Sequence, residues 1–223
     1  EEIRVNTSVP RGRIYDRYGR VLIDNEPENA ITYTRMPNIK NEDILKIAEK
    51  LAGLIDMPIN RVTYRDKQDF WVLKNREAAM EKVSTEEMKE FRLSKENMSK
   101  EEVDAEHYRR VLQRITDEDL TQLSERDLKV LAIYREMVSG YNLSPQIIKN
   151  DQVTDDEFAR VSEQLSELPG VNTTTDWKRV RHVSLAVLGR TSTPSKGIPK
   201  SKLNYYLARE YARNDRVGES YFE

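Results

Sequence analysis

The stretch that says most about the fold is residues 11–22, which read Arg-Gly-Arg-Ile-Tyr-Asp-Arg-Tyr-Gly-Arg-Val-Leu. Two β-prone runs flank Asp16-Arg17-Tyr18-Gly19, which has Asp at the first and Gly at the fourth position of a type I turn. Gly19 can adopt a positive φ at no steric cost, as the bulged loop after such a turn requires. The stretch therefore predicts a β-hairpin. We expect Gly12 to lie where the incoming strand bends or where another backbone comes close.

The composition indicates a strongly solvated molecule. Charged residues make up 34 % of the 223 residues and hydrophobic residues 37 %, a lean apolar share for a compact globule, so we expect an elongated shape. The net charge of -2 differs from that of strongly basic nucleic-acid binders. Residues 178–223 contain ten Lys or Arg and four Asp or Glu, a net +6, which leaves -8 for residues 1–177. Such asymmetry is typical of a solvated face, and also of a docking face or a charged membrane surface.

Several classes of protein are excluded or left open by what the sequence lacks. It has no cysteine, which excludes disulfides and thiolate metal sites. No run approaches the roughly 18 apolar residues of a membrane span, and no signal peptide is visible. The chain begins with Glu1-Glu2 rather than Met, so we expect a segment of a longer protein.

The order of secondary structure predicts β-rich ends and a helical middle. Helices are favoured by an apolar stripe at Ile44, Ala48 and Leu51, and by capping boxes at Ser99-x-x-Glu102 and Thr154-x-x-Glu157. The expected strands are 3–9, 30–34, 146–149 and 171–180, with 70–73 a strand or a turn; the expected helices are 41–54, 61–66, several in 77–123, 124–140, 154–168 and 200–207.

This order predicts an α+β fold. Residues 1–35 and 171–223 are expected to pair into one discontinuous β base, and residues 36–170 to form an inserted, mainly helical lobe. In this arrangement the first two dozen residues and the last dozen meet in one sheet.

Three stretches of the chain resemble the class B penicillin-binding proteins. Residues 11–22 are similar to that family's first motif, Arg-Gly-x-Ile-x-Asp-Arg-x-Gly-x-x-Leu, which Arg11, Gly12, Asp16, Arg17 and Gly19 match. Residues 214–223 are similar to its third motif, through Gly218 and Glu219, and residues 168–179 to the stretch before its second. In addition, residues 30–35 and 130–137 look like the Gram-positive branch of this family. The order and spacing agree over nearly the whole chain. In the second motif, however, 179–182 read Arg-Val-Arg-His where Arg-x-Tyr-Pro is usual, so that only Arg179 matches, and Glu210 stands where Gly is common.

The resemblance implies a function for the segment. It would be the extracytoplasmic pedestal of a membrane-anchored D,D-transpeptidase that cross-links peptidoglycan, binds β-lactams, and sits on the outer face of the cytoplasmic membrane. Its partners would be its own transpeptidase domain, a glycan-polymerising membrane protein and cell-shape or division regulators, with a homodimer also allowed. Asp16 and Arg17 would tie the hairpin to the C-terminal strands, and Gly218 would allow close backbone approach.

The sequence offers no catalytic, cofactor or metal site. Penicillin-binding transpeptidases use Ser-x-x-Lys, Ser-x-Asn and Lys-Thr-Gly, and none of these occurs here. The two histidines, His107 and His182, are isolated, and His107 is expected to be a partly buried packing residue. No glycine-rich phosphate loop is present. Trp71 and Trp177 are expected in the core.

Two other functions are open on the residues alone. One is a free-standing scaffold module, which would lack a continuation into Ser-x-x-Lys. The other is a nucleic-acid binder that uses the basic C-terminal third, where tyrosines and arginines interleave at 205–216. A tyrosine-rich packing helix explains the same pattern, and no nucleic acid is expected.

Overall fold

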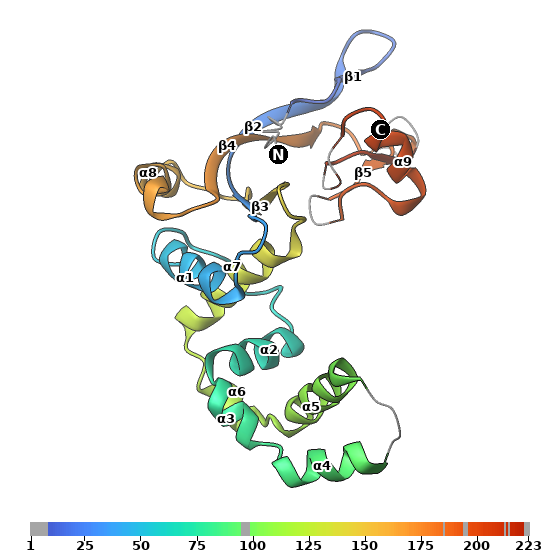
Figure 1. The fold of residues 1–223 in the computed structure, drawn as a ribbon. Helices are drawn as coiled ribbons and strands as arrows, with labels where there is room; N and C mark the ends of the chain where they lie inside the picture. The colour runs from blue at the N-terminus through green and yellow to red at the C-terminus, as the bar shows by residue number, and fades with distance from the viewer. Residues whose placement is uncertain are drawn as a thin grey trace. The chain divides into compact units, whose positions relative to one another are not determined.

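The computed structural model describes residues 9–94, 99–184, 186–193, 196–211, 213 and 215–220 (Figure 1). Most of the strand predicted at 3–9 and the end of the third motif, 221–223, lie outside these residues. The chain divides into two compact units, one formed by residues 1–57 together with 133–223 and the other by residues 58–132. Each unit is described by itself below.

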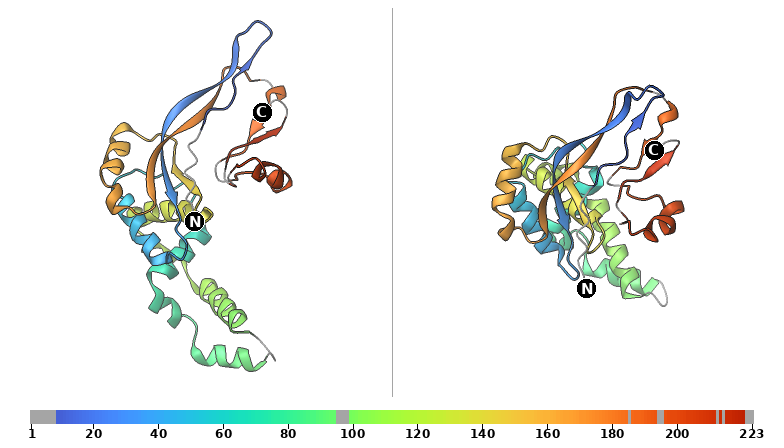
Figure 2. Two further views of the ribbon diagram at one scale, coloured as in Figure 1. Left: turned by 45° about the horizontal axis from the view of Figure 1, so that its top comes forward. Right: turned by 90° about the horizontal axis from the view of Figure 1, so that it is seen from above.

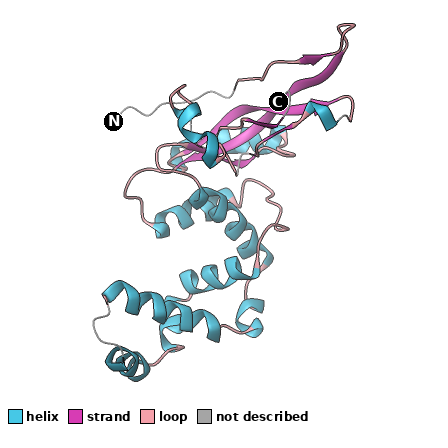
Figure 3. Ribbon diagram, turned by 90° about the vertical axis from the view of Figure 1, so that its right-hand side faces the viewer, coloured by secondary structure: helices cyan, strands magenta, loops and turns pink. Residues whose placement is uncertain are grey.

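The first unit is built on an antiparallel sheet around β2, Val21–Thr34. Strand β2 pairs along its length with β4, Val171–Arg181, from Ile23 opposite Arg181 to Tyr33 opposite Val171. The two strands run side by side as one long twisted ribbon (Figures 2 and 3). The other neighbours of β2 are β1, Ile14–Tyr15, and β3, Pro145–Lys149. A sheet formed by strands from both parts of the chain confirms the predicted α+β class.

Helices of the first unit cover the end of this sheet. Ala30, Ile31, Thr32 and Tyr33 are all buried, and since successive strand residues point to opposite faces, both faces are covered there. Helix α8, Asp155–Glu163, packs on β2 and β4. The same unit contains α1, Asn41–Leu51, and the 3-10 turn η1, Leu165–Glu167. The sequence analysis expected residues 36–170 to form one inserted lobe. The boundaries between the two units, at 57/58 and 132/133, both fall inside this segment.

The C-terminal segment forms a small sheet of its own. Strand β6, Gly218–Ser220, pairs with β5, Arg190–Thr191, and with no strand of the main sheet among the described residues. The prediction that the last dozen residues join the hairpin in one sheet is therefore wrong for Gly218–Ser220, whereas β4, from the predicted base segment 171–223, does pair with β2. Short helical elements complete the segment: η2, Ala186–Leu188, η3, Lys200–Lys202, and α9, Leu203–Leu207.

The second unit is helical. Its core consists of buried apolar side chains from several short helices, namely Trp71, Ala79, Val83, Val111, Leu112, Ile115 and Leu120. The helices are α2, Tyr64–Lys74, α3, Arg76–Glu81, α4, Thr85–Ser94, α5, Lys100–Arg114, and α6, Asp117–Thr121; α7, Glu125–Ser139, extends across the boundary between the units. Residues 70–73 lie in α2, so their prediction as a strand or turn is wrong. None of the described helices is long and apolar enough to span a bilayer.

Candidate functional site

The hairpin of the first motif is closed by the side chain of Asp16. Its Oδ1 accepts hydrogen bonds from the amides of Tyr18 at 2.8 Å and Arg20 at 2.9 Å, and its Oδ2 accepts one from Arg20 Nε at 2.7 Å. Gly19 has φ +79° and donates its amide to the Asp16 carbonyl at 3.0 Å, which confirms the predicted turn. The backbone hydrogen bond from Arg20, with the further bonds from Arg20 and Tyr18, lowers the pKa of Asp16.

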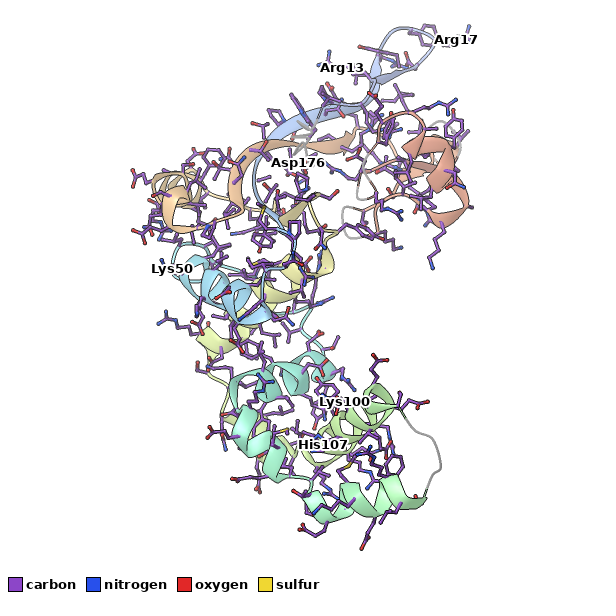
Figure 4. All side chains as sticks on the ribbon, viewed as in Figure 1. Arg13, Arg17, Lys50, Lys100, His107 and Asp176 are labelled. Carbon is purple, nitrogen blue, oxygen red and sulfur yellow. The ribbon has the colours of Figure 1, made fainter. Side chains whose placement is uncertain are left out.

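The contacts that the structure describes for Asp16 and Arg17 lie within the hairpin. The Arg17 guanidinium lies 5.0 Å from the centroid of the Tyr18 ring, and Figure 4 labels Arg17 and Arg13 on the hairpin, apart from Asp176 on β4. The contacts of Asp16 described above are made with the turn itself. Asp16 thus shapes the turn, and a tie from this pair to the C-terminal strands remains a prediction.

Gly12 was expected at a bend of the strand or at a close backbone approach, and only the second can be judged. A Cβ built on Gly12 would have no described atom within 4 Å, so no close approach to the described residues requires glycine there. The residue is exposed and lines a cavity.

We expect Asp16→Ala to lower the melting temperature of the first unit, because the turn loses the acceptor of three hydrogen bonds. Arg17→Ala in the same turn is the matched control and should leave it unchanged, since Arg17 only lies over an exposed ring. Differential scanning calorimetry measures both. Equal melting temperatures for Asp16→Ala and the parent chain would contradict this role.

The link between the N-terminal motif and the rest of the base runs through Arg11. The Arg11 carbonyl accepts a hydrogen bond from Asn25 Nδ2 at 2.7 Å, and Arg179 Nη1 donates to Asn25 Oδ1 at 3.1 Å. Asn25 and Arg179 are register partners on β2 and β4. Arg11 Nη1 donates to the carbonyl of Arg216 at 3.4 Å. Two residues predicted from the motifs, Arg11 and Arg179, thus come together through Asn25.

A buried carboxylate on β4 holds the C-terminal segment. Asp176 is 1 % exposed; it accepts hydrogen bonds from Arg216 Nη2 and, at 2.8 Å, from Asn150 Nδ2. A buried carboxylate requires charged or polar partners, and these lie 26 and 40 residues away in sequence. Neither Asp176 nor Arg216 is among the site residues predicted from the motifs. The available signal was a lone Asp at an inward position of a Val- and Thr-rich strand.

The residues of the third motif bind within the small sheet. Gly218 is buried, pairs with Thr191, and its carbonyl accepts a hydrogen bond from Lys202 Nζ at 3.1 Å. Glu219 forms an ion pair with Arg190 at 3.3 Å. The close backbone approach expected at Gly218 remains a prediction.

A cavity of about 640 Å³ lies between these segments of the first unit. Its walls come from residues 9–12, β2, β3, β4, Thr191 and residues 209–211, 215 and 216; the charged residues that line it are Arg11, Asp176, Arg179, Arg209, Glu210, Asp215 and Arg216. Guanidinium and carboxylate groups at such a wall hold segments of polypeptide through hydrogen bonds and charge. Among the described residues, no group of three or more His, Cys, Asp or Glu could hold a metal ion.

The backbone conformation at Glu210 explains why glycine is common at this position in the family that the sequence resembles. Its φ is +66°, in the left-handed region that glycine adopts without a steric cost. Glycine is common at this position in the family that the sequence resembles. The backbone conformation therefore accounts for that preference, and Glu210 adopts the conformation in spite of its side chain.

A buried ion pair between Lys149 and Glu157 connects β3 to α8. Lys149 Nζ donates to Glu157 Oε1 at 2.9 Å and to Oε2 at 2.8 Å, and the two side chains are 8 % and 5 % exposed. Glu157 also accepts hydrogen bonds from the amides of Asp56 and Thr154. Burial by itself raises the pKa of Glu157, but the hydrogen bonds from Lys149, Asp56 and Thr154 outweigh it and hold the pKa below its ordinary value.

Other residues singled out from the sequence lie elsewhere. Trp71 is buried in the core of the second unit as predicted, whereas Trp177 is only partly buried and lines the cavity. His107 is partly buried on α5, as expected for a packing residue. Tyr205 and Tyr211 are 56 % and 42 % exposed, so the expected tyrosine-rich packing helix is wrong for these two rings.

The first unit is thus built on one β-sheet, to which hydrogen bonds of Arg11 and Arg216 attach the N-terminal motif and the C-terminal segment. Helices are inserted in the sequence between the strands of this sheet. Residues 6–223 match the family described as the Penicillin-binding Protein dimerisation domain. The chain belongs to this family, which confirms the resemblance to the class B penicillin-binding proteins.

Relatives from Gram-positive bacteria agree with this. The chain is 43 % identical to penicillin-binding protein 2A of Bacillus subtilis (strain 168) over 226 residues, covering 100 % of this chain and 31 % of that protein. It is 31 % identical to penicillin-binding protein H of the same organism, covering 96 % and 33 %. The chain thus spans about a third of the length of these curated relatives.

A solved structure shows the same fold. Penicillin-binding protein 2B from Streptococcus pneumoniae (strain 5204) superposes with a TM-score of 0.68 at 24 % sequence identity, covering 97 % of this chain and 33 % of that one.

Proposed function

We propose that this chain is the non-catalytic, extracytoplasmic pedestal of a membrane-anchored peptidoglycan D,D-transpeptidase. In this role it positions the catalytic domain and contacts a glycan-polymerising membrane protein and cell-shape or division regulators. The family match and the third of each relative's length that the chain spans support a segment of a larger protein of this kind.

One observation carries the positioning role. Arg216, within the third motif, is held by the buried Asp176 of β4 and by the side chain of Arg11 from the first motif. Since β4 is itself paired with β2 over eleven register positions, the segment that contains Gly218–Ser220 is attached to the longest strand pair of the described sheet. A domain that follows such a segment would be held by the base. The description of the family supports a homodimer among the proposed partners.

Labelling with a fluorescent penicillin tests whether this segment is non-catalytic and belongs to a longer, catalytic protein. The longer protein that continues into Ser-x-x-Lys is expected to form a covalent adduct, and this 223-residue segment to remain unlabelled. A longer reading frame without Ser-x-x-Lys would favour the free-standing scaffold. Covalent labelling of the segment itself would overturn the proposal.

The same longer protein tests the positioning role. Arg216→Ala should leave the rate of penicillin labelling unchanged while lowering the amount of cross-linked peptidoglycan made in cells, because the catalytic serine is untouched and its support is loosened. Arg126→Ala, on an exposed position of α7 in the second unit, is the control. Equal cross-linking by the two variants would argue against positioning through Arg216.

A further inference from the structure

The C-terminal part of the first unit exposes aromatic and basic side chains together. Tyr205 is 56 % exposed, Tyr141 55 %, Tyr211 42 % and Leu207 36 %. With their neighbours these side chains form what we call the tyrosine–arginine patch: Tyr141, Tyr205, Tyr206, Leu207, Arg209, Tyr211 and Arg213. Tyr141 is distant in sequence and joins the patch through Arg213, whose guanidinium lies 5.4 Å from the centroid of its ring. Large exposed side chains that gather in this way mark an interaction surface.

Contacts within the patch hold its members in place. The Arg209 guanidinium lies 3.6 Å from the centroid of the Tyr205 ring, and Arg209 Nη1 donates to the Tyr205 carbonyl at 2.9 Å. Tyr206 makes edge-to-face contacts with Tyr205 at 5.2 Å and with Tyr211 at 5.1 Å between centroids. The patch is therefore preorganised, and little side-chain entropy remains to be lost on binding.

The charge around the patch is positive. Residues 196–213 contain five Lys or Arg and one acid, Glu210, although the whole chain carries a net charge of -2. The cations Lys196, Lys200, Lys202, Arg209 and Arg213 are all exposed. An anionic surface would thus be attracted to this segment and not to the chain in general.

We propose that the tyrosine–arginine patch docks on the headgroups of an anionic phospholipid bilayer. Tyrosine side chains are favoured at the boundary between headgroups and acyl chains, where the ring is buried and the hydroxyl stays hydrated. Arginine forks bind phosphate oxygens. Leu207 and the tyrosine rings supply the apolar contact that a shallow insertion requires.

The ring contacts disfavour a nucleic acid at the same place. Binding of single strands depends on free aromatic faces on which bases stack. One face of Tyr205 is covered by Arg209, and Tyr206 is engaged with two neighbouring rings. A nucleic acid bound only through its phosphates would make no use of the exposed apolar side chain of Leu207.

Cosedimentation of the whole chain with vesicles tests this proposal. The chain should bind vesicles of equal parts phosphatidylglycerol and phosphatidylcholine, and bind pure phosphatidylcholine weakly. We expect Arg209→Ala to weaken binding to the anionic vesicles about fivefold, the effect of one basic residue near such a surface. Tyr205→Ser should weaken it as well. Arg126→Ala, the charge-matched control on the second unit, should bind like the parent chain.

Each other result overturns the proposal. Equal binding to both vesicle types would remove the role of the arginines, and an equal loss in Arg126→Ala would show an effect of net charge. Binding of single-stranded DNA that Arg209→Ala abolishes, without vesicle binding, would assign the patch to nucleic acid. Circular dichroism checks that the variants, which change exposed positions, remain folded. The result does not depend on penicillin labelling, so the proposed function stands or fails separately.

Discussion

Glu157→Gln is expected to lower the free energy of unfolding of the first unit by about 3 kcal/mol at neutral pH, because it leaves a buried Lys149 ammonium without its counter-ion. The side chain keeps its size, and Gln can still close the capping box with Thr154, so the loss reports mainly the charge. In thermal unfolding this corresponds to a decrease of roughly 6–12 °C for a unit of this size.

The matched control is Glu163→Gln on the same helix. Glu163 is exposed, and a surface substitution of this kind changes stability by less than about 0.5 kcal/mol. Urea unfolding at neutral pH measures both variants. Free energies of unfolding that agree for the parent, Glu157→Gln and Glu163→Gln would show that the ion pair is not stabilising.

The pH dependence gives a second test of the same pair. The pKa of Glu157 lies below its ordinary value of 4.5 in the folded state, so its charge stabilises the fold fully above that value. The contribution is lost as the pH falls from 4.5 through the lower pKa of the folded state. The difference in unfolding free energy between the parent and Glu157→Gln should therefore shrink on acidification across this range.

Local signals identified several elements of the fold correctly. The capping boxes at Ser99 and Thr154 form as the sequence predicted, since each depends on residues three apart. Ile44, Ala48 and Leu51 are buried along one stripe of α1. The four-residue apolar run at 70–73 was misjudged because its length fits a strand and a buried helix equally. The capping box of Thr63 with Asp66 is the local sign that a helix begins before this run.

Contacts between residues far apart in the sequence could not be predicted from local patterns. The Asp176–Arg216 contact joins residues 40 apart and has no local pattern, so the anchor of the C-terminal segment was missed. The choice of β4 and not β6 as the partner of β2 depends on strand length, because eleven register pairs bury more surface than three residues can. The motif residues were found by resemblance, and only the structure shows that Arg11 and Arg179 meet through Asn25.

Gly170→Ala is expected to destabilise the first unit by about 3 kcal/mol, from left-handed strain and overpacking together. Gly170 has φ +84° in the turn that follows Pro169, and the amide of Val171 donates to the Leu168 carbonyl across that turn at 2.9 Å. A Cβ there would lie 2.7 Å from the carbonyl oxygen of Thr34 and 2.9 Å from the Tyr33 ring. Neither can move easily, because Tyr33 is 1 % exposed and the Thr34 amide is bonded to the Gly170 carbonyl at 2.8 Å.

Two other glycines separate the strain from the clash. Gly19 also has a positive φ, +79°, but a Cβ there meets no atom within 4 Å, so Gly19→Ala should cost only about 1 kcal/mol. Gly12 has neither constraint, and Gly12→Ala should leave the unfolding free energy of the unit unchanged. Urea unfolding should therefore rank the three variants in the order Gly170, Gly19, Gly12. A Gly170→Ala variant no less stable than Gly19→Ala would mean that the turn moves away from β2 without cost, and that this end of the sheet is loosely packed.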